Sequence, residues 1–221
     1  TRSWDAERRS RTRRLERAAA AIPSLRGKIL DADHVVDLLE AVIEPGDRVC
    51  IWSPNCAEWT IAQFATAKAG LILVNINPAY RLRELEYALN QSGISVLVAA
   101  REFRKTDYIE MLVGLMPELS TSRLGAAGGR VIPSLRHIIY LGSEGAPGGT
   151  AWTDFIAQHG GASDADLFHR EAKLQFDDPA NIQYTSGTTG SPKGATLSHH
   201  NILNNGYFLG EALRYTAADR I

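Results

Sequence analysis

Residues 48–78 read RVCIWSPNCAEWTIAQFATAKAGLILVNINP, and this stretch decides the fold class. Its two ends, 48–52 and 71–76, are short apolar runs that predict buried strands. The segment between them has apolar residues at helical spacing, with Asn55 as its expected N-cap and Gly70 at its end. A strand, a helix and a second strand in this order are typical of a parallel sheet.

The same alternation continues along the chain. The sequence predicts further helices at 82–89, 108–115 and 152–159, and further strands at 94–98 and 135–141. The Ser-, Gly- and Ala-rich segments 120–130 and 142–149 predict surface loops. We therefore expect an α/β fold with mainly parallel sheet layers and flanking helices. In such folds, ligand sites lie in the loops beyond the strand ends.

Composition excludes several classes of function. The formal net charge is −1, with 44% hydrophobic and 22% charged residues, which indicates no general attraction to nucleic acid or anionic membranes. No run reaches the roughly 18 apolar residues of a membrane span. Cys50 and Cys56 have no nearby histidines and fit no common zinc site. Reduced thiols predict a cytoplasmic location.

Residues 1–44 differ from the rest of the chain. The first 17 residues contain seven arginines against three acidic residues. A basic arm for nucleic acid or a membrane is one interpretation, but aromatic residues do not alternate with the arginines, so a solvated helix or frayed terminus is favoured. Apolar residues from Val35 to Val42 predict a helix that stops at residues 44–47. We therefore divide the chain into 1–44, a basic helical segment, and 45–221.

A second unusual stretch is residues 184–194, which read YTSGTTGSPKG. Apolar strand-like residues flank it at 182–184 and 195–198, and a helix is expected to start near Asn201. The stretch therefore joins two strands, whereas the Walker A loop joins a strand to a helix. We expect residues 185–194 to form an irregular loop that is among the most mobile segments without a ligand.

The composition of this stretch suits an anion. Glycines allow backbone amides to converge on one oxygen cluster, hydroxyls donate hydrogen bonds, and the lysine adds a compact positive charge. The candidate binding residues are Thr185, Ser186, Gly187, Thr188, Thr189, Gly190, Ser191, Lys193 and Gly194. By composition alone, a mobile hairpin and a polyphosphate cradle both remain open.

At these residues the chain resembles the adenylate-forming (AMP-binding) enzymes, which include acyl-CoA synthetases, peptide-synthetase adenylation domains and luciferases. Residues 185–194 match the phosphate-binding signature of that superfamily at every expected position. Segments 53–59, 63–70 and 74–85 also resemble it, and the last is most similar to medium-chain-type fatty-acyl-CoA synthetases. The resemblance runs from about residue 46 to 221, whereas 1–44 follows the family pattern poorly.

The resemblance implies a reaction and its substrates. ATP and a carboxylate, here a fatty acid, would give an acyl-adenylate and pyrophosphate, and CoA would then take the acyl group as a thioester. The nine candidate residues would bind the β- and γ-phosphates, with Mg²⁺ accompanying the nucleotide. The family's acidic motif, ribose-binding aspartate, acyl pocket, and carboxy-terminal domain with its catalytic lysine have no counterpart here. Residues 45–221 are thus expected to be an incomplete AMP-binding domain, with no catalytic residue, metal ligand or CoA site.

The favoured interpretation is a fragment of an ATP-dependent acyl-CoA ligase that is inactive by itself. Two other interpretations compete with it. One is an acyl-AMP ligase or an adenylation domain that loads a carrier protein. The other is a non-catalytic truncated module that binds nucleotide weakly or pairs with other chains. His199 and His200 invite a metal site, but neighbours on a strand point to opposite faces, so we assign them none. Asp177 and Asp178 are interpreted as a turn.

Overall fold

The computed structural model describes residues 46–121, 129–157, 164–185 and 192–219. These residues form a seven-stranded sheet in the order β7-β6-β3-β1-β2-β8-β9. The strands are β1 (Arg48–Trp52), β2 (Ile72–Asn75), β3 (Val96–Ala99), β6 (His137–Tyr140), β7 (Thr150–Ala151), β8 (Pro179–Thr185) and β9 (Lys193–Ser198). Each neighbouring pair is parallel except β8 and β9, which are antiparallel. The parallel sheet predicted over residues 48–141 is confirmed.

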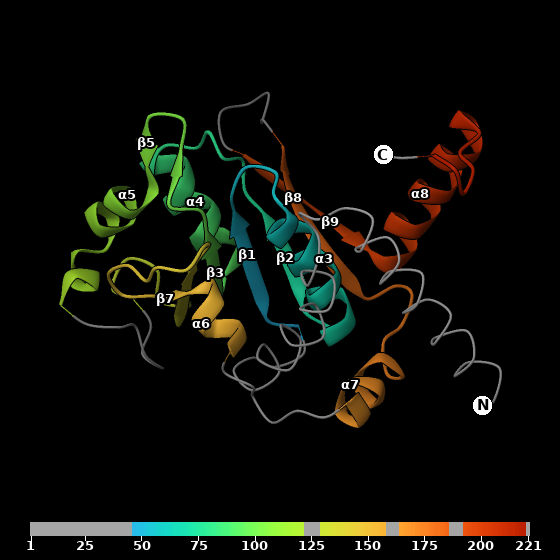
Figure 1. Cartoon of the computed structure of the whole chain (residues 1–221), viewed down its shortest axis with the longest axis horizontal. Coiled ribbons are helices and arrows are strands. Elements are labelled where there is room, and N and C mark those ends of the chain that lie inside the picture. Colours follow the sequence, from blue (N-terminus) through green and yellow to red (C-terminus); the bar gives the residue numbers. More distant parts are fainter. Residues whose placement is uncertain (1–45, 122–128, 158–163, 186–191, 220–221) are drawn as a thin grey trace.

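Helices cover both faces of this sheet (Figure 1). The helices are α3 (Ala57–Ala69), α4 (Leu82–Ser92), α5 (Tyr108–Leu115), α6 (Trp152–Ala157), α7 (Asp164–Glu171) and α8 (His199–Leu213). A small antiparallel hairpin, β4 (Glu102–Phe103) with β5 (Thr106–Asp107), precedes α5, and a 3₁₀ turn at Pro117–Ser120 follows it. No helix in the described ranges is both long and apolar enough to cross a bilayer.

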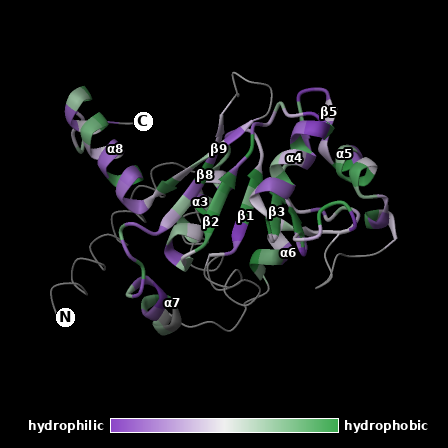
Figure 2. Cartoon of the chain, turned by 180° about the vertical axis from the view of Figure 1, so that it is seen from behind, coloured by the Kyte–Doolittle hydropathy of each residue, from purple (hydrophilic) through white to green (hydrophobic). Residues whose placement is uncertain are grey.

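The strands divide their side chains between two hydrophobic cores because successive residues point to opposite faces. On β1, Cys50 and Trp52 enter the core covered by α4 and α5, while Val49 and Ile51 enter the core covered by α3, α6 and α7. β3 alternates in the same way. The result is a three-layer α/β/α arrangement, and Figure 2 shows the hydrophobic colouring concentrated in the central strands.

Glycines end two of the predicted helices as expected. Gly70 closes α3 with φ +72° and Gly93 closes α4 with φ +59°, both in the left-handed region that glycine adopts at little cost. The predicted N-cap of α3 is wrong, because Cys56 occupies that position instead of Asn55. Helix α5 has the predicted bounds and begins at the cap Asp107, whose carboxylate accepts from the Glu110 amide.

Other differences from the sequence predictions are local. Helix α8 begins at His199 rather than near Asn201, because the Ser198 hydroxyl caps it. His199 and His200 are therefore helical, and the strand predicted for them is wrong. Helix α7, hairpin β4–β5 and strand β7 were not predicted. The helix predicted at 35–42 and the domain boundary predicted near residue 45 lie outside the described residues. Most of the predicted loop 120–130 also lies outside them.

Candidate nucleotide-phosphate site at the end of β8

The candidate loop follows the carboxyl end of β8. Since β8 is parallel to β2, this end lies at the same edge of the sheet as the ends of β1, β2, β3 and β6. β9 returns antiparallel beside it, with Thr185 opposite Lys193 and Tyr184 opposite Gly194. The predicted strands on both sides of the loop are thus confirmed. The predicted bounds of the loop are wrong at both ends, because Thr185, Lys193 and Gly194 pair across the two strands and belong to them. Residues 186–191 lie outside the described residues.

Three of the nine candidate residues are described: Thr185, Lys193 and Gly194. The Thr185 hydroxyl donates to the Lys193 carbonyl across the strand pair, at 3.4 Å. The Lys193 side chain is exposed and has no ion-pair partner among the residues that the structure describes. Its positive charge is therefore available to an anion at the mouth of the hairpin.

Gly194 lies in a tight position beside Tyr184. A Cβ at Gly194 would lie 3.0 Å from Ile182 Cγ2 and 3.4 Å from Tyr184 Cζ. The first distance is closer than carbon atoms ordinarily approach, so a larger residue would push the Ile182 side chain or the neighbouring strand away, and it would lie against the Tyr184 ring. The glycine therefore serves close cross-strand packing at the base of the loop, in addition to any role toward a ligand.

The hydroxyl of Tyr184 connects β8 to helix α4. It lies 3.0 Å from Gln91 Oε1 and 3.2 Å from the Ala88 carbonyl oxygen, so its proton faces two acceptors. Burial raises the pKa of Tyr184, and the hydroxyl remains a neutral donor around neutral pH. The sequence pattern predicts Tyr184 only as a strand residue and gives no sign of this contact, because Gln91 is 93 residues away in the chain.

Comparison with known proteins identifies the family. The sequence model described as AMP-binding enzyme matches residues 31–221. The chain belongs to this family. The medium-chain acyl-CoA ligase ACSF2, mitochondrial, of Danio rerio is 45% identical over 178 residues, which cover 80% of this chain and 29% of that protein. The Homo sapiens protein of the same name is 42% identical with the same coverage. The chain thus spans about 29% of the length of these relatives.

A solved structure agrees with this family and fold. The anthranilate CoA ligase AuaEII, in complex with anthranoyl-AMP, is 26% identical to this chain with a TM-score of 0.63. The match covers 86% of this chain and 31% of that one. The α/β fold predicted from the sequence and the resemblance to AMP-binding enzymes are both confirmed.

Buried amides join β8 to the centre of this AMP-binding fold. Asn75 Nδ2, at the end of β2, donates to Asn181 Oδ1 on β8 at 3.3 Å, and Asn181 Nδ2 donates to Gln63 Oε1 on α3 at 3.3 Å. Asn75 Oδ1 is buried and has no hydrogen-bond partner among the residues that the structure describes. This network was not predicted, although the polar Asn75 inside the apolar run 71–76 indicates a buried polar contact.

Side chains also order the other loops at this edge. Trp52, the last residue of β1, stacks on Tyr108 with ring centroids 3.6 Å apart. The Tyr108 hydroxyl donates to the carbonyl of Pro78, in the loop after β2. Arg101, after β3, donates to the Glu144 carbonyl, in the loop after β6, at 2.8 Å. The edge that carries the signature loop is therefore built of loops held together by long-range contacts.

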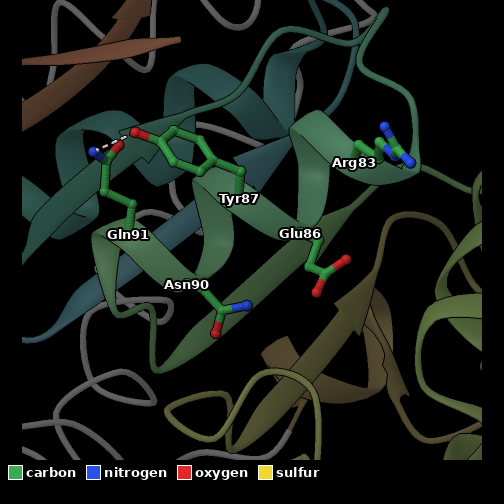
Figure 3. A pocket seen from close by; sticks show the side chains of 5 residues that line it. All are labelled: Arg83, Glu86, Tyr87, Asn90 and Gln91. Atoms are coloured by element: carbon green, nitrogen blue, oxygen red, sulfur yellow. Dashed lines mark hydrogen bonds between the residues drawn. The ribbon is translucent and has the colours of Figure 1, made fainter. Parts of the chain in front are cut away.

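Neither the groove near the site nor the acidic and histidine side chains of the described residues form a binding site for an identified ligand. A groove of about 530 Å³ lies on the outer surface of α4, and all its lining side chains come from that helix (Figure 3). Within the described residues, no group of three or more His, Cys, Asp or Glu side chains could hold a metal ion.

His200 is exposed, and its ring centroid lies 5.6 Å from that of Phe176. Asp178 accepts from the Gln175 amide, which confirms the predicted turn.

Proposed function

We propose that the full-length protein containing this chain is an ATP-dependent acyl-CoA ligase that acts on fatty acids, with medium-chain acids as the first substrates to test. The observation that carries this proposal is the 45% identity to a protein named as a medium-chain acyl-CoA ligase. The position of the signature residues at the sheet edge where ligands bind in α/β folds supports it.

The proposed reaction has two steps. A carboxylate oxygen attacks the α-phosphorus of ATP, the bond between that phosphorus and the bridging oxygen breaks, and pyrophosphate leaves with the electron pair. The sulfur of CoA then attacks the acyl carbon, loses its proton, and displaces AMP. The first step brings two anions together, so neutralising the phosphates and holding them in line are the main tasks of the protein.

The nine signature residues would perform part of that task. We assign the β- and γ-phosphates to Thr185, Ser186, Gly187, Thr188, Thr189, Gly190, Ser191, Lys193 and Gly194. Amides and hydroxyls would donate hydrogen bonds, and the exposed Lys193 amine would supply the positive charge. The antiparallel pairing of Thr185 with Lys193 supports this assignment, because it brings the two ends of the signature side by side.

A magnesium ion is proposed to arrive with the nucleotide. The described residues offer no cluster of acidic or histidine ligands for it, so we assign no residue of this chain to the metal. CoA likewise has no assigned residue here. The chain spans about 29% of the length of its relatives, and we propose that it shows little or no turnover by itself.

The test is ATP–pyrophosphate exchange, which reports the first step without CoA. We expect the full-length protein to exchange with fatty acids. Lys193→Ala should slow exchange by about 100-fold at ATP concentrations below its KM, because it removes the positive charge proposed to bind the phosphates. Lys173→Ala is the matched control, since Lys173 is also exposed but precedes the opposite end of β8. Its exchange rate should equal that of the wild type.

Three outcomes would contradict the proposal. Exchange with amino acids but not with fatty acids would favour an adenylation domain that loads a carrier protein. Acyl-AMP formation without transfer to CoA would favour an acyl-AMP ligase. Exchange at an ordinary enzyme rate by the 221-residue chain alone would disprove the proposed inactivity of the fragment.

We also propose a cytoplasmic location. Both cysteines are free thiols, which suits a reducing compartment. The names of the relatives in Danio rerio and Homo sapiens assign those proteins to mitochondria, so the test must separate the two compartments. A fluorescent fusion of the full-length protein should be diffuse in the cytoplasm, and overlap with a mitochondrial marker would contradict this.

A further inference from the structure

Tyr184 occupies the position between the hydrophobic core and the signature loop. It is the last partly buried residue of β8, since Thr185 beyond it is exposed. Across the strand pair it faces Gly194, the neighbour of Lys193. Its ring is therefore the last side chain of β8 that packs toward the core, one residue before the described part of the strand ends.

The return strand depends on this contact. From Lys193 to Thr196 every residue of β9 is exposed, so this part of the strand has no buried side chain of its own. Backbone hydrogen bonds to β8 hold it, together with the close approach of the Tyr184 ring and Ile182 to Gly194. Where the end of β8 lies thus determines where the Lys193 backbone lies.

The end of β8 is in turn held by α4. The Tyr184 hydroxyl donates toward Gln91 Oε1 and the Ala88 carbonyl. Gln91 is fixed from its other side, because its Nε2 donates to the Tyr87 hydroxyl at 2.8 Å (Figure 3). The helix itself is rigidly placed, since Leu85 and Leu89 are fully buried in the core.

We propose that Tyr184 is a positioning residue for the phosphate site: its hydroxyl fixes the end of β8 to α4, and its ring sets the place of Gly194 and so of Lys193. This role rests on the function proposed above. The contacts run without a break from the core through α4, Tyr184 and Gly194 to the lysine. Burial raises the pKa of Tyr184, so the hydroxyl remains a donor around neutral pH.

The positioning role predicts a specific kinetic change. The phosphate charges of ATP are present before the reaction, so a displaced lysine weakens ATP binding and leaves carboxylate binding intact. A purely structural role would instead lower the fraction of folded enzyme, which reduces kcat and leaves both KM values unchanged. The split between KM and kcat therefore separates the two roles.

The experiment uses Tyr184→Phe in the full-length protein, with pyrophosphate exchange measured at varied ATP and at varied fatty acid. Loss of one hydrogen bond should raise the KM for ATP about fivefold. We expect kcat and the KM for the fatty acid to change less than about twofold. Gln91→Met, which removes one of the two acceptors, should raise the KM for ATP in the same direction by a smaller factor.

Tyr140→Phe is the matched control. Tyr140 ends β6 at the same edge of the sheet, is fully buried, and its hydroxyl also donates to a backbone carbonyl, that of Pro147, at 3.1 Å. Its loss should lower stability without changing the KM for ATP. An equal rise in that KM for both tyrosine variants would overturn the positioning role, as would an unchanged KM in Tyr184→Phe.

The two proposals fail in different ways. If the wild-type protein exchanges pyrophosphate and Lys193→Ala does not, an unchanged Tyr184→Phe disproves the positioning role alone. If the wild-type protein exchanges with no carboxylic acid, the proposed function fails, and the positioning role fails with it.

Discussion

The central strands and the β9–α8 region are packed in opposite ways. Every residue of β2 and β3 is buried, and so is every residue of β1 except Arg48. In contrast, β9 and α8 contain no buried residue, although parts of α8 have the green colour of hydrophobic residues in Figure 2. The exposed apolar residues of this helix are Leu203, Tyr207, Phe208, Leu209 and Leu213.

This difference in burial means that the strands that stabilise the fold are distinct from the region proposed to bind phosphate. The central strands bury their side chains on both faces, so the folding free energy of the described chain is concentrated there. The two described ends of the signature, Thr185 on β8 and Lys193 on β9, lie at the border between these regions, where Tyr184 of β8 contacts α4 and β9 is exposed from Lys193 to Thr196. The β8 end is therefore held by side-chain contacts, whereas the β9 end depends mainly on its pairing with β8.

The largest expected effect compares one leucine from each region. Leu97→Ala should lower the free energy of unfolding of the 221-residue chain by about 3 kcal/mol, because Leu97 is fully buried and the substitution leaves a cavity. The same change at Leu203, which is 75% exposed, should cost less than about 0.5 kcal/mol. Urea denaturation of both variants measures this difference. Equal losses would show that α8 is packed in the folded chain in solution.

A smaller effect tests the junction between the two regions. Asn181→Ala removes the hydrogen-bond partner of the buried Asn75 amide and of Gln63, and should cost about 2 kcal/mol, because a buried donor is left unpaired. The control is Asn204→Ala, since Asn204 Nδ2 donates to the His200 carbonyl on the exposed α8. Alanine favours helix there, so stability should stay within about 0.5 kcal/mol. A loss at Asn204 as large as that at Asn181 would contradict the comparison.

The same contrast explains which parts of the fold the sequence could predict. The central strands are continuous apolar runs, and the helices between them end at glycines, so local pattern and tertiary structure agree. The start of α3 could not be placed, because the Cys56 side chain makes no capping hydrogen bond there and Asn55 has the better capping propensity. Helix α7 and the hairpin β4–β5 are short, and their patterns carry little signal.

The candidate site was predictable only in part. The signature residues and the two flanking strands follow from the string YTSGTTGSPKG and its neighbours. The contacts that hold the base of the loop are long-range: Tyr184 meets a residue of α4, and Asn181 meets residues of β2 and α3. Separations of 93 to 118 residues leave no trace in local periodicity. Only the polar Asn75 within an apolar strand indicated such a contact.

The smallest effect concerns two helix caps, one from each region. Ser198 Oγ accepts from the Asn201 amide at the start of α8, and Asp107 Oδ1 accepts from the Glu110 amide at the start of α5. Either change to alanine should cost about 1 kcal/mol of helix stability, which is roughly fivefold in an opening equilibrium. Helix α5 buries Tyr108 and Leu112 in the core, whereas α8 buries nothing. The same loss of helix stability should therefore appear in global unfolding for α5 and only in local opening of the helix for α8.

Asp107→Ala should lower the global free energy of unfolding, because α5 cannot open without exposing core residues. Ser198→Ala should leave global unfolding unchanged and reduce amide exchange protection in α8 alone, by about fivefold, because that helix opens independently of the sheet. Hydrogen exchange resolved by residue, together with urea denaturation, distinguishes the two. If Ser198→Ala also lowered the protection of the β1 and β3 amides, α8 would be coupled to the central strands, and the loop would lie between two cooperative regions rather than at the border of one.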